Sequence, residues 1–381
     1  MEIRPYHTNA KKHPKKQIEQ VANSIKEFGM NQQIVVDKQG VIIVGHGRYE
    51  ALKLLGMEVK PEYIKVVDLT EQQAKAYRLA DNKLNESEWD MTLVIEELKE
   101  LEPAMLDLTG FDKDLIIEAD EKDDEVPEIP EEPKSRIGDL YELGEHRVLC
   151  GDSTKVDDVE KLMDEKKADM VFTDPPYGMN FDIKNDDDNF RQVFTDALAN
   201  MYAFSKKENW YICGNFKCLS FFHLEVEKLG LELYEKIVWV KNLYGQGKLY
   251  NRMHEDILFC GSGSFYKIDK DVDVWKEDSV RNFMGSKNAN EAVGHPTQKP
   301  VNLCIRAIKN SSKNEDIAMD LFLGSGSTLI ASEKTGRICY GMELDPKYID
   351  VIVQRYVDFT GIEEVKLNGT IIPWKKTKQT K

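Results

Sequence analysis

Between residues 147 and 359, short apolar runs that suit buried strands alternate with amphipathic segments that suit helices. We expect strands at 147–150, 168–173, 209–213, 235–240, 257–260, 317–322 and 338–344, and helices at 156–166, 190–205, 216–229, 300–310, 328–335 and 346–359. This alternation predicts an α/β fold with a doubly wound, mostly parallel sheet. In such a fold, ligands bind at the carboxyl ends of the strands.

Composition divides the 381 residues into two folded units. Residues 119–136, ADEKDDEVPEIPEEPKSR, are acidic, contain three prolines and lack apolar periodicity, which predicts an extended linker. We therefore expect a small accessory domain at 1–118 and a larger domain at 137–375.

Charge and cysteine usage narrow the class of protein. The formal net charge of −16 counts against a nucleic-acid binder, although it does not exclude a local basic groove. The first sixteen residues have no apolar segment typical of a secretory signal, and the apolar runs are too short to cross a bilayer. The six cysteines are scattered, which is typical of buried thiols in a cytoplasmic protein with no membrane association.

The segment DLFLGSGST at 320–328 reads as a strand, a glycine-rich turn and the start of a helix. Glu343 ends the next strand 19 positions after Gly324, close to the spacing at which a carboxylate binds ribose hydroxyls. Leu329 replaces the third glycine of a dinucleotide-binding turn, so a nucleoside without phosphates is favoured. This pattern indicates S-adenosylmethionine rather than NAD, unless the segment is an ordinary turn.

The segment VFTDPPYG at 171–178 ends a buried strand on a carboxylate. An exocyclic amine on a nucleobase is a poor nucleophile, and acceptors that hold its NH2 group would activate it. Asp174 and the carbonyl of Pro175 can be those acceptors, preorganised at a rigid strand end. Tyr177 can then stack on the base. A simple Asp-Pro-Pro turn is the alternative.

Taken together, these motifs resemble the amino-group DNA methyltransferases. DPPY at 174–177, HPTQKP at 295–300, DLFLGSGST at 320–328 and GDS at 151–153 occur in the order of the permuted beta class, with the catalytic motif before the cofactor loop. The resemblance implies a class I methyltransferase fold that uses S-adenosylmethionine. A motif beginning with Asp favours N6 of adenine over N4 of cytosine in this family.

The resemblance also implies a role for each matching residue. The target amine and base would be held by Asp174, Pro175, Pro176 and Tyr177. The cofactor would contact Asp152, Thr173, Asp174, Thr297, Lys299, Asp320, Phe322, Gly324, Ser325, Gly326, Thr328 and Glu343.

The implied substrate is double-stranded DNA with its target base swung out of the helix. Candidate DNA contacts are Lys241, Gln246, Lys248 and Arg252, although a solvated loop would have the same composition. Transfer would be direct, because no cysteine follows a proline as carbon-5 cytosine chemistry commonly requires. A homodimer and a cognate restriction enzyme are both compatible with the sequence, which decides neither.

The N-terminal unit contains a predicted hairpin, with strands at 34–36 and 41–44, followed by the turn Gly45-His46-Gly47-Arg48. Residues 1–85 resemble the ParB/sulfiredoxin-like fold. Of the charged box that binds a nucleoside triphosphate in ParB proteins, only Arg48 clearly remains. Fewer cations weaken such a site. Sulfiredoxin activity is excluded because the unit has no cysteine. A DNA-docking or partner-binding module is the function that remains.

Four hypotheses follow from the sequence. The first is a DNA adenine-N6 methyltransferase with a ParB-like accessory domain. The second is an enzyme of the same fold that acts on cytosine N4 or on RNA. The third is a noncatalytic ParB-like DNA-binding protein with a degenerate methyltransferase domain, against which the intact Asp174, Gly324, Gly326 and Glu343 argue. The fourth is an NAD oxidoreductase.

Overall fold

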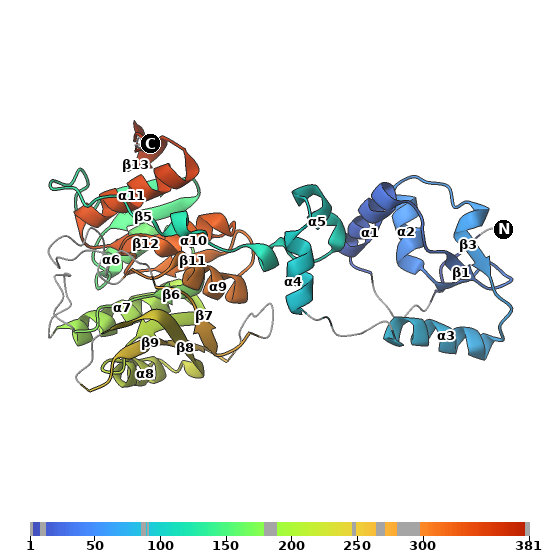
Figure 1. Cartoon of the computed structure of the whole chain (residues 1–381), viewed down its shortest axis with the longest axis horizontal. Coiled ribbons are helices and arrows are strands. Elements are labelled where there is room, and N and C mark those ends of the chain that lie inside the picture. The colour runs from blue at the N-terminus through green and yellow to red at the C-terminus, as the bar shows by residue number, and fades with distance from the viewer. Residues whose placement is uncertain are drawn as a thin grey trace. The chain divides into compact units, whose positions relative to one another are not determined.

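A computed structural model describes residues 3–7, 13–84, 89, 91–178, 189–245, 249–263, 271–279 and 298–377. The chain divides into two compact units, Met1–Ile116 and Ile117–Lys381, which Figure 1 shows in blue to teal and in green to red. None of the helices that the structure describes combines the length and the apolarity needed to cross a bilayer.

The first unit contains a three-stranded sheet in the order β2-β1-β3. Strands β1 (Ile34–Val36) and β2 (Ile42–Val44) pair antiparallel, as the hairpin prediction requires, and β3 (Ile64–Val66) pairs parallel with β1. Asp37 stabilises the turn because its Oδ1 accepts from the backbone N–H groups of Gln39 and Val41. The helices are α1 (Lys15–Phe28), α2 (His46–Leu54), α3 (Glu71–Leu84), α4 (Met91–Lys99) and α5 (Pro103–Thr109).

The second unit is built on a sheet of 11 described strands in the order β10-β8-β9-β7-β6-β11-β12-β5-β4-β13-β14. The central strands β7, β6, β11, β12 and β5 run parallel to one another, and the sheet extends on both sides through the antiparallel pairs β7-β9 and β5-β4. Their bounds are β4 Leu140–Leu143, β5 His146–Cys150, β6 Ala168–Thr173, β7 Ser205–Gly214, β8 Glu232–Gly245, β9 Arg252–Gly261, β10 Val274–Lys276, β11 Ile317–Asp320, β12 Ile338–Glu343, β13 Glu364–Leu367 and β14 Thr370–Pro373.

Helices cover both faces of this sheet (Figure 1). On β6, Val171 packs with the apolar sides of α6, α7 and α8, whereas Met170 and Phe172 pack with α9 and α10 on the opposite face. Alternate side chains of one strand therefore enter two cores, which is the arrangement expected of a doubly wound sheet. The helices are α6 (Val156–Met163), α7 (Phe190–Phe204), α8 (Leu219–Lys228), α9 (Val301–Ser311), α10 (Ser327–Lys334) and α11 (Pro346–Thr360).

The predicted α/β class and the parallel centre of the sheet are confirmed, and each predicted strand and helix of this unit overlaps an observed one. The differences lie at the edges of the sheet. Strands β7, β8 and β9 are longer than predicted, and β4, β10, β13 and β14 were not predicted. Edge strands are solvated on one side, so their sequences lack the continuous apolar runs that mark the central strands.

Residues 119–136, predicted to be a linker, make specific contacts within the second unit. The side chain of Asp123 is buried and accepts from Nζ of Lys334 at 2.6 Å. Asp350 on α11 accepts from the backbone N–H groups of Lys134 at 2.6 Å and Ser135 at 3.1 Å, and from the Ser135 hydroxyl at 2.5 Å. The acidic, proline-containing segment is thus held at both ends against the larger unit, because its polar groups find buried partners there.

We expect Asp350→Ala to destabilise the second unit by about 3 kcal/mol, because two backbone N–H groups and one hydroxyl lose a charged acceptor. Urea unfolding followed by tryptophan fluorescence measures this. Ser135→Ala removes only the hydroxyl bond and should cost about 1 kcal/mol. Equal midpoints for Asp350→Ala and the wild type would show that the segment is not anchored here.

Candidate active site

Four acidic residues lie at the carboxyl ends of four adjacent strands. Asp320 and Glu343 are the last residues of β11 and β12, Asp174 directly follows β6, and Asp152 lies just beyond β5. The strands are neighbours in the order β6-β11-β12-β5 and run parallel, so these ends meet at one edge of the sheet. Segments separated by up to 191 positions in sequence are brought together in this way.

Both carboxylate oxygens of Asp174 have partners. The ammonium group of Lys299 donates to Oδ2 at 2.5 Å, and the hydroxyl of Tyr177 donates to Oδ1. Pro175 is buried directly after the strand, whereas Pro176 and Tyr177 are half-buried. The DPPY motif and the lysine of HPTQKP, 125 positions apart, therefore form one hydrogen-bonded group.

Lys299 also faces a second carboxylate, that of Glu255 in β9, at 3.5 Å from Oε2. Glu255 Oε1 in turn accepts from Nζ of Lys241 in β8. Burial lowers the pKa of Lys299, but the carboxylates of Asp174 and Glu255 outweigh it and raise the pKa above the ordinary value. Burial raises the pKa of Glu255, but Lys299 and Lys241 outweigh it and hold the pKa below its usual value.

Glu255 was not among the residues predicted from the sequence. The strand was predicted to begin at Ile257, which left Glu255 outside it. In the structure Glu255 belongs to β9 and pairs in register with Trp239 of β8. The available signal was an acid shortly before an apolar run, whereas Asp174 was identified because it directly follows one.

The glycine-rich turn between β11 and α10 has the backbone that its sequence predicts. Gly324 and Gly326 have φ of +55° and +90°, in the left-handed region that glycine adopts without strain. Asp320, 3% exposed, accepts from the Phe322 N–H at 3.1 Å and from the Thr328 hydroxyl at 2.7 Å. The carboxylate therefore ties the strand end to the first turn of the helix.

Glu343 is bonded to the same turn. Its Oε2 accepts from the Gly324 N–H at 3.0 Å, and its Oε1 accepts from the Asp345 N–H at 2.9 Å. Burial nevertheless raises the pKa of Glu343 to about 7. Burial also raises the pKa of Asp320 to about 7, with a further contribution from the charge of Asp174. Two carboxyls thus titrate near neutral pH beside the catalytic motif.

Other predicted cofactor residues lie nearby but are engaged locally. Asp152 Oδ1 accepts from the backbone N–H of Thr154 at 3.0 Å and from its hydroxyl at 2.7 Å, as in a turn-forming aspartate. Thr173 and Ser325 are buried, and the Ser325 carbonyl accepts from Arg355 at 3.0 Å. Thr297 lies outside the described residues.

The predicted DNA contacts have mixed placements. Lys241, with its side chain 20% exposed, is bonded to Glu255 rather than extended into solvent. The guanidinium of Arg252 stacks on the ring of Phe216, with its Cζ atom 4.1 Å from the centroid. Gln246 and Lys248 lie outside the described residues.

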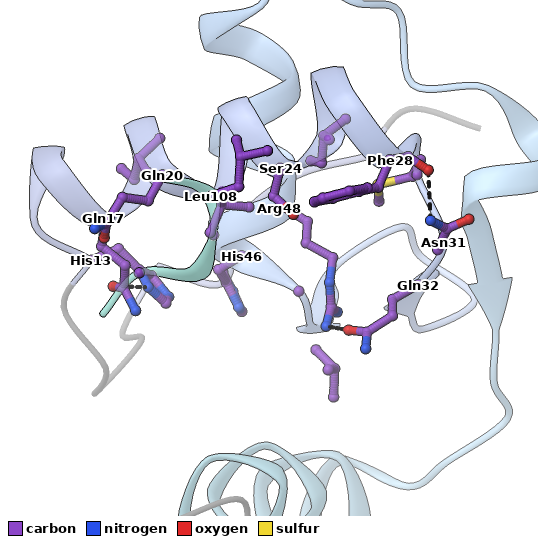
Figure 2. Close-up of a pocket in the computed structure, with 18 of the residues that line it drawn as sticks. His13, Gln17, Gln20, Ser24, Phe28, Asn31, Gln32, His46, Arg48 and Leu108 are labelled. Atoms are coloured by element: carbon purple, nitrogen blue, oxygen red, sulfur yellow. Dashed lines mark hydrogen bonds between the residues drawn. The ribbon is translucent and has the colours of Figure 1, made fainter. Parts of the chain in front are cut away.

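A pocket of about 630 Å³ lies in the first unit, around the turn at Gly45–Arg48 (Figure 2). Gln17, Gln20 and Ser24 of α1 line one wall, and the side chain of Arg48 projects into the space and donates to Gln32. Gly45, with φ of +96°, is the N-cap residue of α2 and turns the backbone directly before the helix.

The pocket carries little net charge. Among its described lining residues, Arg48 is the only arginine or lysine, and Asp81 is an acid. Nε2 of His46 accepts from the backbone N–H of Tyr6 at 3.2 Å. Burial, together with Arg78 and His13, lowers the pKa of His46 to about 4, so this imidazole is uncharged at neutral pH. A nucleoside triphosphate carries about four negative charges, which one guanidinium does not balance.

Comparison with known proteins gives two family matches. Residues 168–354 match the model of the family described as DNA methylase, and residues 2–83 match that of the ParB N-terminal domain. The first match contains DPPY and the glycine-rich turn, and the second contains the turn that lines the pocket.

Individual relatives cover the second unit. The type II methyltransferase M.HpaI of Haemophilus parainfluenzae is 27% identical over 246 residues, which is 58% of this chain and 77% of that protein. The DNA adenine methyltransferase YhdJ of Escherichia coli K12 is 28% identical over 235 residues, 51% of this chain and 78% of that protein.

Solved structures with related folds include M1.HpyAVI, at 19% identity and a TM-score of 0.41 over 55% of this chain and 96% of that one. The cytosine-N4-specific PvuII DNA methyltransferase has 14% identity and a TM-score of 0.44 over 56% of this chain and 86% of that one.

The catalytic motif, the glycine-rich turn and the sequence relatives agree with one another. Residues 168–354 of this chain therefore resemble the DNA methylase family, and residues 2–83 resemble the ParB N-terminal domain.

Proposed function

We propose that the chain transfers a methyl group from S-adenosylmethionine to the N6 amine of adenine in double-stranded DNA. The observation that carries the proposal is the position of Asp174 at a strand end, on the same edge of the sheet as Asp320 of the adjacent strand and Glu343 of the strand after that. The motif begins with Asp, which favours adenine in the family that it resembles, and the relative YhdJ is named an adenine methyltransferase.

The residues at the edge of the sheet suit this cofactor. S-adenosylmethionine supplies a methyl group activated by a positively charged sulfur, and it carries ribose hydroxyls and an ammonium group. Glu343 offers carboxylate oxygens to the ribose hydroxyls. Asp320 offers a negative charge that suits the positively charged sulfur and ammonium groups of the cofactor. The Gly324–Gly326 turn lets a ligand approach the backbone closely. A nucleoside without phosphates fits this acidic edge better than a dinucleotide does.

At the reacting base, Asp174 would accept hydrogen bonds from the NH2 group and take the proton that the methylated nitrogen loses. The Pro175 carbonyl would be a second acceptor. Its direction is restricted because Pro175 has a fixed φ and because Pro176 limits the conformation of the residue before it. Moving the base out of the duplex costs a few kcal/mol. The ring of Tyr177 would then stack on the exposed base. These groups act by holding the amine in line with the donor, which supplies most of the rate.

We also propose that the enzyme acts in the cytoplasm. All six cysteines are buried thiols without a disulfide, as suits a reducing compartment.

Incubation of unmethylated genomic DNA with radiolabelled cofactor, followed by digestion to nucleosides, should place the label on N6-methyladenine. Asp174→Ala should lower kcat by about 10²–10³-fold, because the preorganised acceptor is lost. Asp157→Ala, an exposed acid on α6, is the matched control and should keep wild-type activity. Label on N4-methylcytosine would contradict the choice of base, and undiminished activity of Asp174→Ala would contradict the catalytic assignment.

Cofactor binding should release protons near neutral pH. Asp320 and Glu343 have pKa values of about 7 and are partly protonated in the free protein. Because these pKa values are raised in the folded protein, the contribution of the two carboxyls to folding stability is fully present below their ordinary pKa values of about 4. That contribution is lost as the pH rises through 7. A bound ligand with positive charge and hydroxyl donors favours the ionised forms, so its affinity should rise between about pH 6 and pH 8.

Calorimetry in buffers of different ionisation enthalpy measures the protons released on binding. The release should be smaller in Glu343→Gln, because one titrating group is gone. A cofactor affinity that is constant from pH 6 to pH 8 would contradict the assignment of these carboxyls to the cofactor site.

For the first unit, we propose a docking module that does not hold a nucleoside triphosphate. The pocket at Gly45–Arg48 has one guanidinium, an uncharged His46 and an opposing acid among its described residues. Calorimetric titration of the full chain with each common nucleoside triphosphate and Mg²⁺ should give no saturable binding up to about 1 mM. Micromolar binding that disappears in Arg48→Ala would show instead that the pocket is a nucleotide site.

A further inference from the structure

Four charged side chains form one partly buried cluster beside the DPPY motif. Asp174 follows β6, Lys241 lies in β8, Glu255 lies in β9, and Lys299 directly precedes the proline that begins α9. Their side chains are 20%, 20%, 21% and 6% exposed, respectively. Two carboxylates face two ammonium groups, so the formal charges balance. We refer to these four residues as the charge cluster.

In this arrangement the acceptor needed for the proposed reaction is already in use. Lys299 donates to one oxygen of Asp174 at 2.5 Å, and Tyr177 donates to the other. A short, charge-assisted bond to an ammonium group draws electron density from the carboxylate. A target amine bound to Asp174 in this state would meet a weakened acceptor.

Lys299 cannot simply leave Asp174 without another partner. Its side chain is 6% exposed, so moving it away would strand a positive charge out of contact with water. An uncompensated buried charge costs several kcal/mol. Activation of Asp174 therefore requires a second acceptor within a short distance of the same ammonium group.

Glu255 provides that acceptor. Its Oε1 accepts from Lys241, whereas its Oε2 is buried, lies 3.5 Å from Nζ of Lys299 and has no hydrogen-bond partner among the described residues. A charge-assisted N–H···O bond is about 2.8 Å long, so a shift of about 0.7 Å would complete it. Because Glu255 is paired in register with Trp239, its backbone is fixed while the lysine side chain moves.

We propose that Glu255 is a positioning residue that takes over the Lys299 ammonium group when the target amine binds Asp174. Lys299 then has two partners, Asp174 before the base enters and Glu255 afterwards. The exchange keeps the ammonium group paired at each stage and leaves the net charge of the cluster unchanged. This inference rests on the proposed amino-methyltransferase function and assigns a role to a residue outside the DPPY motif and the glycine-rich turn.

Glu255→Gln tests the proposal, because it keeps the shape of the side chain but removes the charge that attracts Lys299. We expect kcat on unmethylated genomic DNA to fall by at least 10-fold, while KM for S-adenosylmethionine and for DNA changes by less than about 3-fold. Asp256→Asn is the matched control. Asp256 is the next residue of β9, is buried and pairs instead with Lys236 at 3.4 Å, so its kcat should stay at the wild-type value.

Glu255→Asp separates charge from position. It keeps the carboxylate but withdraws it by one methylene from Nζ of Lys299, so its kcat should fall between those of the wild type and Glu255→Gln. Thermal melting of each variant identifies any loss of fold, and Glu255→Asp serves as the test if Glu255→Gln does not fold.

The outcomes separate the two proposals. A wild-type chain that transfers no methyl group to DNA would refute the proposed function. An active wild type with an unchanged kcat in Glu255→Gln, or in Glu255→Asp where that variant is the test, would refute only the role of Glu255. A loss that appears solely as a higher KM, or equally in Asp256→Asn, would also refute it.

Discussion

Parallel hydrogen bonding between β6, β11, β12 and β5 is the constraint on which the candidate site depends. Parallel neighbours end at the same edge of a sheet, so the side chains that follow them meet there. Helices on both faces bury the strands and make their ends rigid. The DPPY motif and the glycine-rich turn are 146 positions apart at Asp174 and Asp320, yet they meet because their strands are adjacent.

The same arrangement concentrates negative charge at a partly buried edge of the sheet, and the fold offsets this charge in two ways. Around Asp174 the compensation is ionic, through Lys299 and, beyond Glu255, Lys241. Around Asp320 and Glu343 it is made by N–H and O–H donors, and the pKa of each carboxyl remains raised to about 7. One half of the edge thus holds paired charges, while the other half holds two buried carboxyls with raised pKa values. This division suits a site that binds a sulfonium cofactor beside a polar base.

The N-terminal unit contains a pocket whose described lining residues carry little net charge. The hairpin, the positive-φ turn at Gly45 and helix α2 lie within residues 2–83, which match the model of the ParB N-terminal domain. Arg48 projects into the pocket, but His46 is held as an uncharged acceptor for a backbone N–H. The side chains that line the pocket therefore decide which ligands this unit can hold.

The sequence by itself determined the α/β class, the two units and the motifs at strand ends, because apolar periodicity, glycine and proline act locally. It also singled out Asp174, Lys299, Asp320 and Glu343 as candidates. It could not find the edge strands, whose half-solvated residues lack a strong apolar pattern, or the anchoring of residues 119–136 by Asp350. Only the tertiary structure placed Glu255 and Lys241 beside the catalytic motif. Such ion pairs arise from strand order and register, which bring together residues that no local pattern connects.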